Sequence, residues 1–175
     1  MSIHPQLQIG FKLGVFWITK RIAIGQFATE SRCEQLLQQG VTHILNVADA
    51  DTTEAARSSA FRDVVAVPVA DLEIIPVESV LRCLDYIDQA MSTPNAKLYL
   101  HCVAGQNRSP TILWLFLLAS GMDADQAKRL IVERCPDAVP GHSALVDEDL
   151  IAAVRAHGRK RKISEHDETA TAPAY

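Results

Sequence analysis

The sequence has 175 residues, of which 48% are hydrophobic and 22% are charged, and its formal net charge at pH 7 is −4. This length and balance are typical of one globular domain with a sizeable core, and they exclude a collagen-like or wholly disordered chain. The acidic balance argues against a general nucleic-acid binder, which needs a basic face, although one locally positive pocket remains compatible with it.

The four cysteines, Cys33, Cys83, Cys102 and Cys135, are scattered and include no Cys-x-x-Cys pair. This spacing favours free thiols in a reducing cytoplasm over a disulfide framework or a structural zinc site. No secretory signal is evident, and the apolar run over 112–119 is far shorter than the ~20 residues of a membrane-spanning helix. We therefore expect a cytoplasmic protein with no membrane span, no metal and no cofactor.

Strands and helices are predicted to alternate along most of the chain. Period-two and apolar runs indicate strands, and amphipathic spacing with capping residues indicates helices. In order, these are a hairpin or bent edge strand over 15–27, a helix over 29–40 that Thr29 or Ser31 caps and Gly40 ends, a strand over 41–48, a loop or short helix over 49–60, a strand over 64–70, a helix from Pro76 to Met91, a strand over 97–102, and helices over 108–119, 123–135 and 142–158.

This order predicts a single α/β domain whose central, mostly parallel sheet is flanked by helices. A phosphate-binding loop is expected between a strand and a helix, at the carboxyl edge of the sheet, where ligands of such folds usually bind. The domain is predicted to cover residues 1–157. The mixed-charge segment 158–175, which includes Arg-Lys-Arg-Lys at 159–162, is predicted to be a disordered tail.

The stretch His101 to Pro110, HCVAGQNRSP, carries the chemistry of this loop. Backbone N–H groups at a helix start bind anions, and Gly105 allows the positive φ that a tight wrap needs. Arg108 offers a planar fork for two phosphate oxygens. Because such donors also stabilise a thiolate, Cys102 is predicted to be an activated nucleophile.

Two further polar residues of this stretch have two interpretations each. Ser109 is expected to donate a hydrogen bond to the sulfur, and capping of the following helix is the alternative. His101 either orients the loop or is a strand histidine with satisfied hydrogen bonds, and it is not predicted to be a base. The substrate-binding positions are predicted to be Val103, Ala104, Gly105, Gln106, Asn107 and Arg108.

His-Cys-x-x-Gly-x-x-Arg-Ser, filled here as HCVAGQNRS, resembles the signature loop of the protein tyrosine phosphatase superfamily. The short chain and the segment GVTHILNVA are most similar to the dual-specificity branch of that superfamily. In that branch the general acid is an aspartate about thirty residues before the cysteine, and the resemblance places this role on Asp71. Glu73, Asp63 and Asp49 are weaker rivals.

The sequence also departs from the family pattern. The asparagine that braces the signature loop in many dual-specificity members falls on Gly141 here, so the support must come from elsewhere. His142, the next residue, is predicted to lie at a helix start. The tyrosine-bearing loop that clamps phosphotyrosine in the larger tyrosine-specific enzymes is not evident, which favours a shallow pocket.

The resemblance implies a cysteine-dependent phosphomonoester hydrolase that acts through a phosphocysteine intermediate. Its expected substrates are phosphorylated protein side chains, phosphotyrosine first and then phosphoserine and phosphothreonine. Two alternatives stay open at this point. One is a phosphatase of inositol phosphates, phosphoinositides or RNA 5′ ends, and the other is a non-catalytic phosphate-binding module.

Overall fold

The computed structural model describes residues 14–58 and 60–170, and for residues 161–170 it describes the backbone only. The elements follow the expected order of alternating strands and helices. They are β1 (Val15–Trp17), β2 (Ile22–Gly25), α1 (Glu30–Gln38), β3 (His43–Asn46), α2 (Glu54–Ser58), β4 (Asp63–Ala66), α3 (Val77–Ser92), β5 (Leu98–His101), α4 (Arg108–Ala119), α5 (Ala124–Arg134) and α6 (Glu148–Ala170).

The five strands form one sheet in the order β1-β2-β5-β3-β4. β1 pairs antiparallel with β2, which confirms the predicted hairpin, and the remaining neighbours pair in parallel. Parallel strands end at the same edge of a sheet, so the segments after β2, β3, β4 and β5 all meet at one edge. β5 is the middle strand, and the loop that follows it therefore lies at the centre of that edge.

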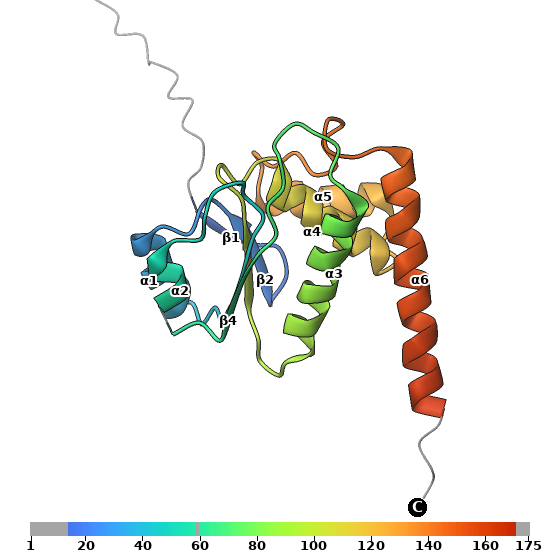
Figure 1. The fold of residues 1–175 in the computed structure, drawn as a ribbon, viewed down its shortest axis with the longest axis horizontal. Helices are drawn as coiled ribbons and strands as arrows, with labels where there is room; N and C mark the ends of the chain where they lie inside the picture. Colours follow the sequence, from blue (N-terminus) through green and yellow to red (C-terminus); the bar gives the residue numbers. More distant parts are fainter. Residues whose placement is uncertain (1–13, 59, 171–175) are drawn as a thin grey trace, which may run out of the picture.

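Helices cover both faces of the sheet, as predicted (Figure 1). α1 and α2 enclose a smaller apolar cluster around Leu36 and Tyr99. The helices α3 to α6 pack over the larger cluster on the other face. α4 is buried at every residue except Phe116, which confirms that the apolar run over 112–119 belongs to a core helix. Among the described residues, no helix is long and apolar enough to cross a membrane.

Several element ends differ from the sequence-based prediction. The strand expected over 64–70 starts one residue earlier, at Asp63, and ends at Ala66, two residues before Pro68. The last helix begins at Glu148 rather than at His142, and Asp147 accepts a hydrogen bond from Leu150 N–H at its start. His142 lies in the preceding turn, so its placement at a helix start was wrong.

The helix predicted over 142–158 also ends later in the structure, because α6 continues to Ala170, into the segment predicted to be a disordered tail. Gly158 is buried where this helix crosses the end of α4. A Cβ built at Gly158 would overlap the backbone of Ala119, so only glycine allows the two helices to approach this closely. The last five positions of the predicted tail, 171–175, lie outside the described residues.

Candidate active site

The segment between β5 and α4 forms a closed loop over residues 102–107. Gly105 has a φ of +74°, as its place in the motif predicts. A Cβ at this position would lie 2.7 Å from the carbonyl carbon of Gly25. The loop is also held from both sides by its own carbonyls, since Val103 O accepts the Phe27 N–H at 3.1 Å and Gln106 O accepts the Val139 N–H at 2.8 Å. The signature loop is therefore a rigid, supported structure.

Two donors converge on the sulfur of Cys102, whose exposed fraction is 2%. The Gly105 N–H donates to Sγ at 3.2 Å, and the Ser109 hydroxyl donates to Sγ at 3.4 Å. Ser109 is fully buried, and the residue at the helix N-cap is Asn107, which makes no side-chain capping bond. The hydroxyl of Ser109 is thus directed at the sulfur and does not cap the helix. Both donors stabilise negative charge on the sulfur.

Arg108 is almost wholly buried, with an exposed fraction of 4%. Its Nη1 donates to Asp49 Oδ1 at 2.7 Å and to Val69 O at 3.1 Å, which anchors one side of the guanidinium to the segments after β3 and β4. Its Nε is buried, has no hydrogen-bond partner, and lies 3.7 Å from Asp71 Oδ1. An unsatisfied buried donor on a cation costs free energy until an acceptor such as a phosphate oxygen arrives.

Asp49 holds this arginine, a role that the sequence analysis missed when it treated the residue as a weaker rival for the acid. The hydrogen bond from Arg108 lowers the pKa of the Asp49 carboxyl, so this group stays ionised at neutral pH and is poorly suited to donate a proton. One feature of the sequence could have indicated this role: Asp49 follows closely after β3, which is a neighbour of β5 in the sheet. Asn46 shapes that turn, because its Oδ1 accepts the Ala48 N–H and its Nδ2 donates to Ala50 O.

Asp71 lies in the segment between β4 and α3, with its side chain 44% exposed. Its Oδ1 accepts the N–H of Leu72 at 3.1 Å, which orients the carboxylate from within its own loop. Of the rivals, Glu73 lies on the same loop and is exposed. Asp63 opens β4 opposite His43 and therefore lies at the amino edge of the sheet, a strand length of about 10 Å from the loops at the other edge.

His101 is the last residue of β5 and contacts the first residue of the loop. Burial lowers the pKa of its imidazole to about 4, so the ring is neutral at pH 7. Nδ1 lies 3.2 Å from the carbonyl oxygen of Cys102, and because that oxygen can only accept, the proton belongs on Nδ1. The ring also stacks on Tyr99 and meets the edge of Phe27. The bond to the loop favours an orienting role, and the alternative, a strand histidine with satisfied hydrogen bonds, fits less well because Nε2 is buried without a hydrogen-bond partner.

The support that the family asparagine provides elsewhere comes here from backbone groups of the segment 136–141. Besides the Val139 N–H bond to the loop, the Gly141 N–H donates to Thr111 Oγ1 at 3.1 Å, and that hydroxyl lies 3.4 Å from Val139 O. Gly141 has a φ of +68° and packs closely on Trp114. A side chain at this position would be strained, so the departure from the family pattern has its own structural reason.

All four cysteines are free and buried. Cys135 lines a small hollow with Ala104, Gly105 and Gln106, behind the signature loop. Among the described residues, no group of three or more His, Cys, Asp or Glu side chains is placed to hold a metal ion.

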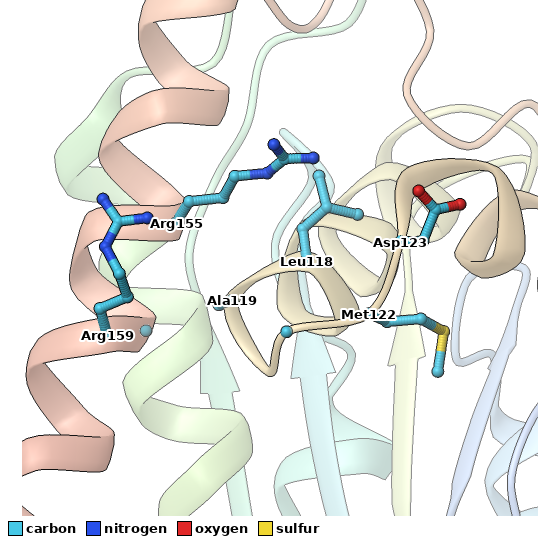
Figure 2. Close-up of a pocket in the computed structure, with 8 residues that line it drawn as sticks. Leu118, Ala119, Met122, Asp123, Arg155 and Arg159 are labelled. Carbon is cyan, nitrogen blue, oxygen red and sulfur yellow. The ribbon is translucent and has the colours of Figure 1, made fainter.

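A second hollow lies away from the signature loop, between the end of α4, the start of α5 and α6 (Figure 2). Its lining includes Met122, Asp123, Arg155 and Arg159, and both arginines extend from α6. None of the residues predicted from the motif lines this hollow, so the converging groups around Cys102 remain the candidate active site.

Solved structures share this fold. The structure of DUSP15 superposes with a TM-score of 0.71 and 20% identity, covering 87% of this chain and 96% of that one. PTPMT1 gives a TM-score of 0.69 and 14% identity over 84% of this chain and 99% of that one. The human tyrosine phosphatase-like serine/threonine/tyrosine-interacting protein gives a TM-score of 0.66 and 18% identity over 84% of this chain and 97% of that one. At these identities the likeness concerns the fold alone.

The family model described as "Dual specificity phosphatase, catalytic domain" matches residues 22–146. This range begins at β2 and ends in the turn before α6, so it contains the signature loop, the Asp71 loop and the bracing segment together. The match covers well over half of the chain, and the resemblance noted in the motif is confirmed: the chain belongs to the dual-specificity phosphatase family and carries that family's catalytic domain.

Proposed function

We propose that this chain hydrolyses phosphate monoesters on protein side chains through a phosphocysteine intermediate, with phosphotyrosine as the main substrate and phosphoserine and phosphothreonine as further ones. One observation carries the proposal. Three groups converge at one edge of the sheet: a thiol with two donors, a buried guanidinium whose Nε has no hydrogen-bond partner, and a carboxylate 3.7 Å from that Nε. A non-catalytic phosphate-binding module would need neither the thiol nor the carboxylate.

In the first step the thiolate of Cys102 attacks phosphorus, the S–P bond forms, and the bond from phosphorus to the substrate oxygen breaks. The leaving oxygen is a poor leaving group unless it is protonated, and Asp71 supplies that proton. The Nε of Arg108 and the backbone N–H groups of the loop bind the equatorial oxygens of the phosphoryl group. Preorganised donors of this kind stabilise the charge of the transition state without rearranging.

In the second step a water molecule attacks phosphorus, the S–P bond breaks, and the thiolate departs with its electron pair. The Asp71 carboxylate takes a proton from the water, which returns the acid to its starting form. The Ser109 hydroxyl and the Gly105 N–H stabilise the departing thiolate. Asp49 positions Arg108 throughout and takes no part in proton transfer, because its ion pair keeps it ionised.

The preference for singly phosphorylated side chains is supported by the loop itself. Its variable positions, Val103, Ala104, Gln106 and Asn107, carry no charge that would hold further phosphates. One structural neighbour, PTPMT1, has been solved in complex with PI(5)P, with a TM-score of 0.68 and 14% identity. Phosphoinositides are therefore the alternative substrate class to test. The free cysteines favour a reducing compartment, and we place the protein in the cytoplasm.

A substrate panel tests the proposal directly. Hydrolysis rates are measured for a phosphotyrosine peptide, a phosphothreonine peptide, a phosphoinositide in mixed micelles and a generic aryl phosphate, with Cys102→Ser as the background. We expect the highest kcat/KM for the phosphotyrosine peptide. A higher value for the phosphoinositide would contradict the assignment to protein side chains. Failure to hydrolyse any of the four would contradict enzymatic function itself.

A further inference from the structure

Large apolar side chains that remain exposed gather around the candidate active site. Most surface valines and leucines of a globular protein are isolated, so a group on neighbouring loops needs an explanation. Among the described residues, the exposed large apolar side chains are Leu72 at 58%, Val103 at 47%, Val139 at 46%, Ile74 at 45%, and Val77 and Val132 at 39% each. Of these six, only Val132 lies inside a helix, α5; Val77 is the first residue of α3, and the other four lie on loops between elements.

Three of these residues lie on three different loops, each next to a group of the site. Leu72 directly follows Asp71, and Val103 directly follows Cys102. Val139 donates its N–H to Gln106 O, which ties its segment to the outside of the signature loop. We name these three residues the apolar rim. The rim is not continuous in the sequence, and only the fold brings its members to one edge.

The backbone at Leu72 gives a second, independent reason to assign a role. Its φ is +57°, a left-handed conformation that is unfavourable for a residue with a Cβ. Glycine or asparagine would adopt this conformation more easily and would not expose an apolar side chain to water. A leucine at this position is therefore unfavourable on both counts in the free protein, and such strain near a site points to a function in the bound state.

The charges beside the rim indicate what it contacts. Asp49, Asp71 and Glu73 lie on the two loops next to Arg108, and the variable positions of the signature loop are uncharged. Carboxylates beside the signature loop disfavour binding of an anionic membrane surface or of a second phosphate, since both would be repelled. Uncharged apolar side chains of a polypeptide avoid this repulsion and can bury themselves against the rim.

We propose that the apolar rim, Leu72, Val103 and Val139, selects phosphoprotein segments that carry apolar side chains beside the phosphorylated residue. This inference rests on the proposed function and names the substrate class within it. Burying one leucine-sized side chain is worth about 1.5 kcal/mol, which corresponds to roughly a tenfold gain in kcat/KM. Acidic flanking residues, by contrast, lower kcat/KM because of the neighbouring carboxylates.

The test compares two phosphotyrosine peptides of equal length that differ only in the residues flanking the phosphotyrosine, leucine in one and asparagine in the other. For the unmodified protein, kcat/KM for the leucine peptide is expected to be about tenfold higher. Leu72→Asn should reduce this ratio to below about threefold, because asparagine tolerates the positive φ and removes the apolar contact. Val139→Thr, which keeps the shape of the side chain, should reduce the ratio as well.

Val132→Thr is the matched control, since it makes the same change on α5 at an exposed position, and it should leave the ratio at its original value. Thermal unfolding shows whether each variant is folded. The proposed role of the rim is overturned if the ratio is near one in the unmodified protein, or if Leu72→Asn leaves the ratio unchanged. In either case, hydrolysis of both peptides still supports the proposed function. Hydrolysis of neither peptide overturns both. Faster turnover of phosphoinositide vesicles, lost in Leu72→Asn, assigns the rim to lipid and overturns the peptide proposal.

Discussion

Cys102 and Cys83 show how two buried thiols in one protein acquire different properties. Their exposed fractions are 2% and 0%, so burial alone does not distinguish them. Cys83 lies in α3 and packs in the larger core, where burial raises the pKa of its thiol to about 12. Cys102 follows β5, and the Gly105 N–H and the Ser109 hydroxyl both point at its sulfur.

The difference lies in the ends of the secondary structure elements. The middle of a helix uses its N–H groups within the helix, and its side chains contact apolar neighbours. A strand end followed by a helix start leaves N–H groups free to bind an anion or a thiolate. In this protein the same side chain is therefore an inert core residue at one place and a candidate nucleophile at the other.

Replacing each sulfur by oxygen should separate the two thiols most clearly, because one change affects activity and the other affects stability. We expect Cys102→Ser to reduce hydrolysis of an aryl phosphate to the background rate, because the serine hydroxyl ionises too weakly to attack phosphorus. Cys83→Ser should keep its kcat/KM but lose about 1–3 kcal/mol of unfolding free energy, since it buries a polar group in the core. Activity and denaturant unfolding are measured for both. A Cys102→Ser protein with more than about a hundredth of the original activity contradicts covalent catalysis.

Asp71→Asn removes the proton that the leaving oxygen of the substrate needs and should lower kcat by roughly 10²–10⁴-fold for phosphotyrosine or an alkyl phosphate. The loss should be much smaller for an ester whose leaving group needs no proton, and the basic limb of the pH–rate profile should flatten. Glu73→Gln, two residues along the same loop, is the matched control and should change kcat little. Equal losses for good and poor leaving groups would assign Asp71 a structural role.

Arg108→Lys keeps the positive charge beside Cys102 and removes the fork. We expect kcat/KM to fall by roughly 10²–10³-fold, nearly as far as in Arg108→Ala, because an ammonium cannot bind Asp49 and a phosphate oxygen with the same planar geometry. Inhibition by orthovanadate or phosphate reports on binding of the oxyanion and should weaken in parallel. Near-normal turnover in the lysine variant would show that charge alone is sufficient.

The smallest change concerns one of the two donors to the sulfur. Ser109→Ala should slow breakdown of the phosphocysteine by about tenfold, the value of a hydrogen bond to a charged acceptor, while formation of the intermediate changes less. A burst of released phenol in rapid-mixing kinetics detects this imbalance. Ser120→Ala is the control, since the Ser120 hydroxyl donates to Phe116 O at the other end of α4. A slower first step without a burst would argue against a role in leaving-group stabilisation.

The sequence could predict which residues of the loop lie together because they are close in the chain, while their catalytic roles stay predictions. Cys102, Gly105, Arg108 and Ser109 lie within eight consecutive residues, and the structure places the glycine in the positive φ region and the serine hydroxyl against the sulfur. Asp71 required more, since only the family resemblance, which places an aspartate about thirty residues before the cysteine, pointed to it. The structure brings its carboxylate to 3.7 Å from Arg108 Nε, while its role as the acid stays a prediction.

Other parts of the site depend on contacts between segments that the sequence does not pair. The ion pair of Arg108 with Asp49 joins the first residue of α4 to the segment after β3. The bond from Val139 N–H to Gln106 O replaces the support of the missing asparagine. The close approach of α6 to α4 is a contact of the same kind. Gly158 packs against the backbone of Ala119, on a helix far away in the sequence.

The sequence by itself determined the α/β alternation, the strand–loop–helix unit and the choice of Cys102 as the candidate nucleophile, because each follows from local periodicity or from a nine-residue motif. Only the tertiary structure decided which carboxylate pairs with Arg108, which segment braces the signature loop and which apolar side chains surround it. These features arise where loops from separate strands meet at one edge of the sheet. Their distances depend on packing across the whole domain, and no stretch of sequence encodes such a distance alone.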